Sequence, residues 1–150
     1  MSTISRRGAL WIGTGAAACL LVRPAAATLE TREAAIRAFA GEAEIKTGRV
    51  KLDLSPLVEN GNAAPLTVAV ESAMTDDDFV RRIAIFNDKN PQPNVITMQL
   101  GPRAGRAQVS TRIRLATSQR ITAIAEMGDG SYWSDSADVI VTLAACVEGG

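Results

Sequence analysis

Two segments, VKLDL (residues 50–54) and LTVAVE (66–71), decide the fold class of this 150-residue chain. In both, apolar residues recur at every second position, and charged, polar or small residues lie between them. A period of two is typical of β-strands that have one buried face. The intervening SPLVENGNAAP (55–65) is rich in turn residues, so we expect two strands with a turn region between them.

Five further segments downstream also read as short strands. They are VRRIAIF (80–86), VITMQL (95–100), AQVSTRIRL (107–115), ITAIAEM (121–127) and ADVIVTL (137–143). The breaks between them are rich in Gly, Pro, Asn, Asp or Ser, and none has a helical period. Seven short strands with regular turns predict an all-β fold, an immunoglobulin-like antiparallel β-sandwich. We assign residues 28–143 to this single domain.

One short helix is expected before the first strand, in TLETREAAIRAFAGE (28–42). Thr28 can cap its start, and Ile36 and Phe39 fall on one apolar face. Gly41 lies near its expected end. The sequence therefore predicts a sandwich with a short N-terminal helix.

Residues 1–27 have the pattern of a twin-arginine signal peptide. Arg6-Arg7 precedes an apolar run, residues 9–22, and AAA follows at 25–27. The apolar run is too short for a membrane span and matches an export signal. The paired arginines indicate the bacterial route for folded proteins, so we expect a periplasmic domain that does not insert into the membrane. A weaker alternative is a lipoprotein acylated at Cys19.

Composition excludes several kinds of site. The chain has no histidine, which removes Ser-His-Asp and Cys-His catalysis and histidine metal sites. Without the arginines of the signal the charge is mildly acidic, so we expect no nucleic-acid partner. The strongest metal candidate, Asp76–Asp78, lacks the alternating spacing of a calcium loop and reads as a solvated turn. We expect no metal and no cofactor.

Cys146 is the main candidate for chemistry, because it would be the one cysteine left after export. An unpaired cysteine in an oxidising compartment indicates intermolecular pairing or a reactive thiol. A buried bystander cysteine fits poorly near a chain end. We interpret residues 144–150 as a flexible C-terminal arm carrying this thiol. Its other residues are Ala144, Ala145, Val147, Glu148, Gly149 and Gly150.

Two other groups of residues have open interpretations. Arg112 and Arg114 lie two apart in a predicted strand, so both project from one face. They form either an ordinary solvated face or a strip that attracts anions or a partner. Tyr132 and Trp133 are interpreted as core or sandwich-edge aromatics rather than a ligand platform.

The chain resembles the SoxY family, the sulfur-carrier subunits of the bacterial thiosulfate-oxidising (Sox) system. The resemblance covers nearly all of the chain from TREAAIRAFAG (31–41) onward. Its most specific parts are NGNAAPLTVAVESAMTDDDFVRRIAIFNDKNPQP (60–93), GRAQVSTRIRLATSQRITAIAEMGDGSYW (105–133) and VTLAAC (141–146).

This resemblance implies a carrier that is not itself an enzyme, with Cys146 as the covalent attachment residue. It implies a heterodimer with a SoxZ-like subunit. It also implies transient contacts with a c-type cytochrome, which conjugates thiosulfate to the thiol, and with a hydrolase that releases sulfate. The alternative is a β-sandwich interaction module whose lone cysteine forms an intermolecular disulfide.

The arm differs from the family pattern, Gly-Gly-Cys-Gly-Gly. Ala144 and Ala145 replace two glycines, and Val147 and Glu148 precede the final Gly-Gly. Alanine disfavours positive φ, so a stiffer arm is expected. Glu148 places a negative charge near the sulfur, which should disfavour the thiolate and repel anionic cargo.

Overall fold

A computed structural model describes residues 29–145, which form one helix, nine strands and two short 3₁₀ turns. The elements are α1 (Leu29–Ala40), β1 (Ile45–Thr47), β2 (Val50–Leu54), β3 (Leu57–Asn60), η1 (Gly61–Ala63), β4 (Ala64–Val70), β5 (Val80–Asn87), β6 (Asn94–Gln99), η2 (Pro102–Ala104), β7 (Gln108–Ile113), β8 (Gln119–Met127) and β9 (Tyr132–Leu143). No helix in this part of the chain is long and apolar enough to cross a membrane.

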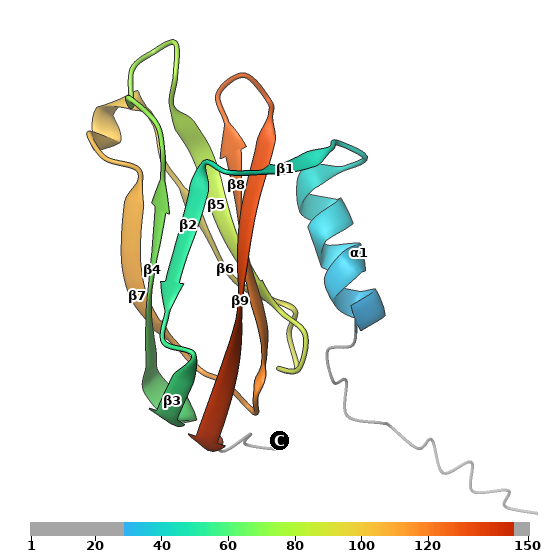
Figure 1. The fold of residues 1–150 in the computed structure, drawn as a ribbon. Coiled ribbons are helices and arrows are strands. Elements are labelled where there is room, and N and C mark those ends of the chain that lie inside the picture. The colour runs from blue at the N-terminus through green and yellow to red at the C-terminus, as the bar shows by residue number, and fades with distance from the viewer. Residues whose placement is uncertain (1–28, 146–150) are drawn as a thin grey trace, which may run out of the picture.

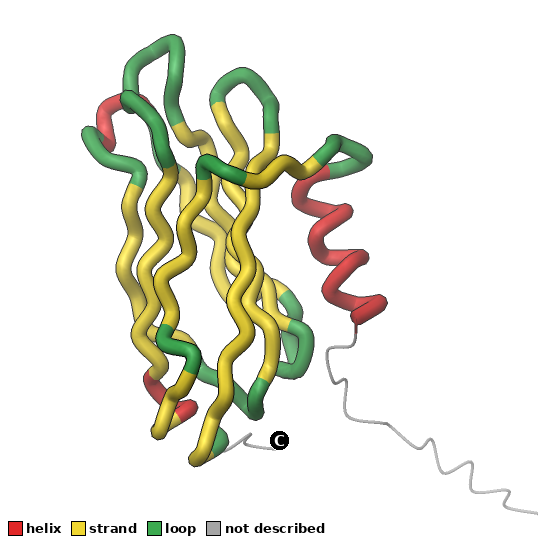
Figure 2. The backbone as a smooth tube through the Cα atoms, in the orientation of Figure 1, coloured by secondary structure: helices red, strands yellow, loops and turns green. Residues whose placement is uncertain are grey.

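The strands form two sheets that pack face to face (Figures 1 and 2). The larger sheet has the order β1-β9-β8-β5-β6, and β3 pairs with the far end of β9. The smaller sheet has the order β2-β4-β7 and is antiparallel throughout. The predicted β-sandwich is confirmed.

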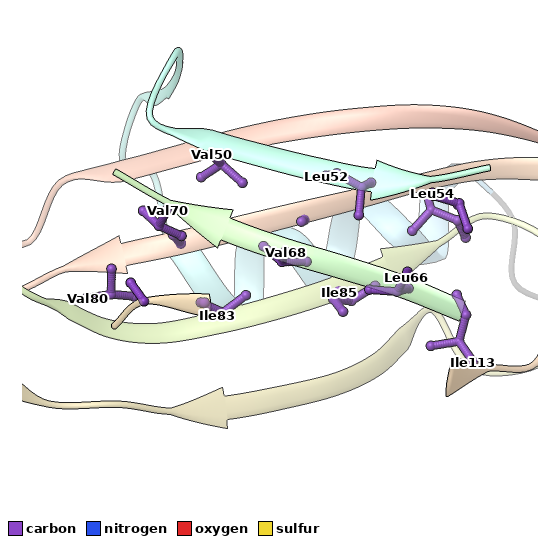
Figure 3. Packing of buried hydrophobic residues seen from close by; sticks show 14 of the residues in the cluster. Val50, Leu52, Leu54, Leu66, Val68, Val70, Val80, Ile83, Ile85 and Ile113 are labelled. Carbon is purple, nitrogen blue, oxygen red and sulfur yellow. The ribbon is translucent and has the colours of Figure 1, made fainter. Parts of the chain in front are cut away.

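The main hydrophobic core fills the space between the two sheets (Figure 3). It includes Val50, Leu52, Leu54, Leu66, Val68, Val70 and Ile113 from the smaller sheet and Val80, Ile83 and Ile85 from the larger one. These are the apolar positions of the period-two pattern, because alternate side chains of a strand face the same side. Burying one such side chain fully stabilises the fold by roughly 1.5–3 kcal/mol, so this layer dominates folding.

Helix α1 covers part of the outer face of the larger sheet (Figure 1). Ile36 and Phe39 of the helix pack against a second cluster made by Ala84, Phe86 and Ile124. The Phe39 ring lies edge-on to Phe86, with ring centroids 5.9 Å apart. β5 and β8 are therefore buried on both faces, and the fold has three layers. The helix ends where Gly41 adopts φ +63, a left-handed conformation that favours glycine.

One charged group is buried beside this helix. The Glu126 carboxylate forms ion pairs with Arg81 and Arg82. The Arg82 guanidinium also lies 4.6 Å from the centroid of the Phe39 ring. The pairing compensates for burying the carboxylate and links the sheet to the end of α1.

All seven predicted strands are present. The structure differs from the prediction in the start of β9 and in having two additional short strands. β9 begins at Tyr132, five residues before the predicted strand, since Tyr132–Asp138 pairs with β8. β1 and β3 are not among the predicted strands; they pair with β9 in parallel, at its start and at its end. The sandwich is therefore antiparallel except along these two short strands.

Candidate functional site

The candidate site is the end of the sandwich at which β9 finishes and the chain continues toward Cys146. β3 and the end of β9 lie side by side there (Figure 1). Ala144 is exposed and Ala145 is buried. The backbone N–H of Ala145 donates a 3.0 Å hydrogen bond to the carbonyl oxygen of Leu115. The fold therefore fixes the residue immediately before the cysteine.

Gly61 makes this arrangement possible by bringing a third backbone segment into contact. Its carbonyl oxygen accepts a 2.7 Å hydrogen bond from the N–H of Leu115. A β-carbon at Gly61 would lie 2.4 Å from the Leu115 carbonyl oxygen and 2.9 Å from the Ala145 nitrogen. Both distances are far below van der Waals contact and involve backbone atoms, which cannot rotate away. Only glycine fits where these three segments meet.

Asn90 holds Leu115 from the other side. Its amide oxygen accepts from the N–H of Ala116 at 3.0 Å, and its amide nitrogen donates to the carbonyl of Arg114 at 2.7 Å. Gln119 donates to the same Asn90 oxygen at 2.8 Å. The backbone on both sides of Leu115 is thus hydrogen-bonded to one side chain, and the fully buried Leu115 supports Ala145.

The predicted arm therefore requires a correction at its start. The flexible arm is predicted to begin at residue 144, but Ala145 is buried and hydrogen-bonded. The fixed part of the chain therefore extends through Ala145. The other predicted site residues, Cys146, Val147, Glu148, Gly149 and Gly150, lie outside the described residues.

An apolar strip lies on the outer face of the larger sheet near the same end. It consists of Leu29, Leu57 and Ile140, with exposed fractions of 57%, 51% and 61%, respectively. Leu57 and Ile140 are register partners on β3 and β9, and Leu29 and Ile140 line one open groove. Leu143, the last residue of β9, is also exposed. Clustered exposed apolar side chains mark an interaction surface.

The groove beside the strip is lined by charged pairs. Arg120 donates two hydrogen bonds to the Asp138 carboxylate, at 2.9 and 2.8 Å. These bonds lower the pKa of Asp138 and raise the pKa of Arg120. Both side chains are exposed, so the pair sets orientation more than stability.

The predicted Asp76–Asp78 turn is far more constrained at Asp78 than at its neighbours. Asp78 accepts hydrogen bonds from the N–H of Ala73 and from Arg49, and both lower its pKa. Asp76 and Asp77 are exposed. Residues 29–145 contain no group of three or more His, Cys, Asp or Glu side chains that could hold a metal ion. Asp78 therefore closes a loop at the opposite end of the sandwich.

The aromatic prediction is confirmed. Trp133 packs against the main core, with Lys46 and Arg49 each 5.8 Å from its ring centroid. Tyr132 packs against the cluster under α1, edge-on to Phe39. Both residues are partly buried and serve packing.

The family model described as "Sulfur oxidation protein SoxY" matches residues 36–146, most of the chain. The chain belongs to the SoxY family. The match ends on Cys146, one residue after the Ala145 support. Among curated proteins, no sequence matches the chain.

Comparison with solved structures agrees with this family assignment. The structure of the sulfur carrier protein SoxY from Chlorobium limicola f thiosulfatophilum superposes with a TM-score of 0.63 and 26% identity. The alignment covers 76% of this chain and 98% of that one. SoxY proteins are sulfur carriers in sulfur oxidation, and this chain has their fold.

Superoxide reductases also resemble the fold. The neelaredoxin of Ignicoccus hospitalis superposes with a TM-score of 0.57 and 13% identity, over 65% of this chain and 94% of that one. A putative superoxide reductase from Thermotoga maritima gives 0.55 and 20%, over 65% and 93%. At such identities the likeness shows the sandwich fold alone.

Replacing Gly61 with alanine should destabilise the protein by about 1–3 kcal/mol, as expected for overpacking against atoms that cannot move. The measurement is the free energy of unfolding from urea denaturation. Gly101→Ala is the matched control, because a β-carbon there meets nothing within 4 Å and its φ of −164 suits any residue. Equal effects of the two substitutions would contradict the backbone contact at Gly61.

Proposed function

We propose that this SoxY-family protein is a periplasmic covalent sulfur carrier whose Cys146 holds thiosulfate-derived or other sulfur intermediates for partner enzymes. The observation that carries the proposal is the family match, which ends on Cys146 directly after the fixed Ala145. A carried thiol needs a firm point of attachment and a short reach beyond it. The hydrogen bond to Leu115 supplies the attachment, and residues 146–150 would supply the reach.

The chemistry of loading needs an external oxidant. The outer sulfur of thiosulfate forms an S–S bond with the Cys146 sulfur, the thiol proton goes to water, and two electrons pass to a c-type cytochrome partner. Hydrolysis then cleaves the bond between the two thiosulfate sulfurs. Water supplies the fourth oxygen of sulfate, two protons are released, and a persulfide stays on the cysteine. Each step is carried out by a partner enzyme.

The carrier role agrees with the side chains that surround the site. The chain has no histidine to serve as a base beside the thiol. The residues that support the cysteine segment, Gly61, Asn90 and Leu115, act through the backbone or through neutral groups. This arrangement can position a thiol but offers it little catalytic help.

We propose further that a SoxZ-like subunit covers the apolar strip in a heterodimer. The strip faces outward from the larger sheet, whereas Ala145 is hydrogen-bonded to Leu115, which belongs to the core between the sheets. A partner on the strip would therefore leave the cysteine segment accessible to enzymes. Stable interfaces have such apolar centres with polar rims, and the Arg120–Asp138 pair lies at the border.

Cys146→Ser should abolish every sulfur adduct that mass spectrometry detects on protein purified from its own periplasm. Its melting temperature should barely change, since surface substitutions stay within about ±0.5 kcal/mol. Cys19→Ser is the control and should keep the adducts. If the native protein instead carries only an intermolecular Cys146 disulfide, it is an interaction module. An acylated Cys19 would indicate a lipoprotein.

Replacing Arg6 and Arg7 with lysines should leave precursor in the cytoplasm, because the twin-arginine route reads that pair. Cell fractionation followed by immunoblotting measures the distribution. Normal export of this variant would refute the twin-arginine assignment.

Ile140→Glu should break the heterodimer while leaving the fold intact, because it places a charge in the centre of the strip. Ile96→Glu is the matched control: Ile96 is also exposed but lies on β6, at the other edge of the same sheet. Light scattering of the protein mixed with its SoxZ-like subunit gives the mass. A dimer lost with Ile96→Glu but kept with Ile140→Glu would move the interface to β6.

A further inference from the structure

Strand β7 is an edge strand of the smaller sheet and has one free side. Within residues 29–145 it pairs with β4 and with no other strand. The N–H of Val70 donates a 2.9 Å hydrogen bond to the carbonyl oxygen of Ala107, and bonded pairs alternate along an antiparallel ladder. The odd-numbered residues of β7 are therefore bonded to β4. The even-numbered residues Gln108, Ser110 and Arg112 direct their N–H and C=O groups away from it.

The same alternation places Arg112 and Arg114 on the outer face of this edge. From residue 106 to residue 115 every even-numbered residue is exposed, and every odd-numbered residue is buried or half-buried. The free edge ends at Arg114, because its carbonyl oxygen accepts a 2.7 Å hydrogen bond from the side chain of Asn90. We call Arg112 and Arg114 the basic edge.

No acidic residue of the edge strands neutralises the basic edge. The sequence has no Asp or Glu between Asp88 and Glu126, the stretch that forms both β6 and β7. The residue opposite Arg112 on β4 is Pro65. Within residues 29–145, neither arginine of the basic edge forms an ion pair. Both guanidinium groups can therefore take an acceptor from another molecule.

Carboxylates on neighbouring elements do not change this conclusion. Asp53 lies on β2, two strands from β7 and thus about 10 Å away across the sheet. Glu71 and Asp76 follow the end of β4, which lies beside the start of β7 rather than beside the basic edge. Glu59 lies on β3, before η1. None of these side chains bonds to the basic edge, and the remaining acid, Glu148, enters the test below.

The ladder of β7 is open to another strand, whereas the other edge strand is interrupted. The register between β5 and β6 shifts at Ile85 and Phe86, and such bulges protect an edge from pairing. β7 has no register shift and no proline. Pairing β7 with a second copy would gather the arginines of both copies on one face, and like charges across a ladder are destabilising. The charge of the edge therefore favours a strand that carries acidic residues.

We propose that β7 is a strand-addition site, at which an extended acidic segment of a partner protein joins the smaller sheet in antiparallel register. Main-chain hydrogen bonds supply affinity, and carboxylates opposite Arg112 and Arg114 supply selectivity. Apolar residues between the carboxylates turn toward the margin of the main core, where Val109 and Met98 are half-buried. β7 lies on the side of the molecule away from α1 (Figure 1). The site requires neither the cysteine nor the carrier function.

A short acetylated peptide in which glutamate and valine alternate is the probe, and calorimetry at low salt measures its binding to the full-length protein. Opposed residues of an antiparallel pair share a face and exchange their own backbone bonds. The glutamate N–H groups should therefore pair with Gln108, Ser110 and Arg112. Methylating the valine nitrogens blocks only the other edge of the peptide, so binding should persist. Methylating the glutamate nitrogens should abolish binding.

Arg112→Gln with Arg114→Gln should weaken binding of the valine-methylated probe about two- to tenfold, as expected for two cross-strand pairs of opposite charge. Arg37→Gln with Lys51→Gln is the matched control, because it removes the same charge from exposed positions on α1 and β2. Glu148 is the one acidic residue outside residues 29–145. Both pairs are therefore compared again in a Glu148→Gln chain, where the same difference is expected.

Several results would overturn the proposal. If the valine-methylated probe does not bind, the arginines serve only to protect the edge from self-association. Equal binding of the two methylated probes would indicate charge attraction without strand addition. Equal weakening by the control pair would assign the effect to net charge. An arginine effect that disappears in the Glu148→Gln chain would assign it to the C-terminal segment.

Discussion

Gly61 lies so close to Leu115 and Ala145 that no side chain can be accommodated between them, and the cysteine end of the molecule depends on this contact. It lets Gly61 of the short turn η1 form a backbone hydrogen bond with Leu115, in the segment after β7. Leu115 in turn forms a backbone hydrogen bond with Ala145, just after β9. Two hydrogen bonds in series, 2.7 and 3.0 Å long, connect the three segments. The direction in which the chain leaves the fold is thus set by backbone geometry, which side-chain motion does not disturb.

The length of helix α1 explains why the outer face of the larger sheet is buried at one end and exposed at the other. α1 has 12 residues, so it is about 18 Å long. It packs on Ala84, Phe86 and Ile124 and leaves Ile140 and Leu57 exposed. The part of the outer sheet face that α1 covers stabilises the fold. The part that α1 leaves uncovered remains available for a partner protein. The same alternation that makes β9 a strand therefore also produces an apolar surface where the helix does not reach.

The sequence predicts the sandwich because apolar and polar residues alternate strongly in its seven main strands. A local pattern cannot reveal short strands that form only because a neighbouring strand pairs with them. β1 and β3 have three and four residues, and they form because β9 offers them a long edge. The segment Tyr132–Ser136 reads as a turn because of its serines and aspartate. In the fold it is strand, because it pairs with β8, and the Asp135 carboxylate also accepts a 2.8 Å hydrogen bond from the N–H of Leu52 in the other sheet.

The same limit applies to the site. Cys146 is visible in the sequence because it is the cysteine that a signal peptide would not remove. Its support is not visible, because Gly61 and Asn90 resemble ordinary turn residues in NGN and NDKNP. Their importance comes from contacts with residues 24 to 84 positions away, between Asn90 and Arg114 or Ala116 and between Gly61 and Ala145. The apolar strip is equally hidden, since Leu29, Leu57 and Ile140 belong to three elements that only the fold brings together.

The alanine at position 145 follows from this geometry. The family pattern places glycines before the cysteine, and glycine loses more conformational entropy than alanine when a segment is ordered. Here Ala145 is ordered by its bond to Leu115 and its methyl group is buried, so alanine favours the attached state. The conformational freedom that glycine would give at position 145 is thereby lost. The fixed point then lies one residue before the cysteine in the chain.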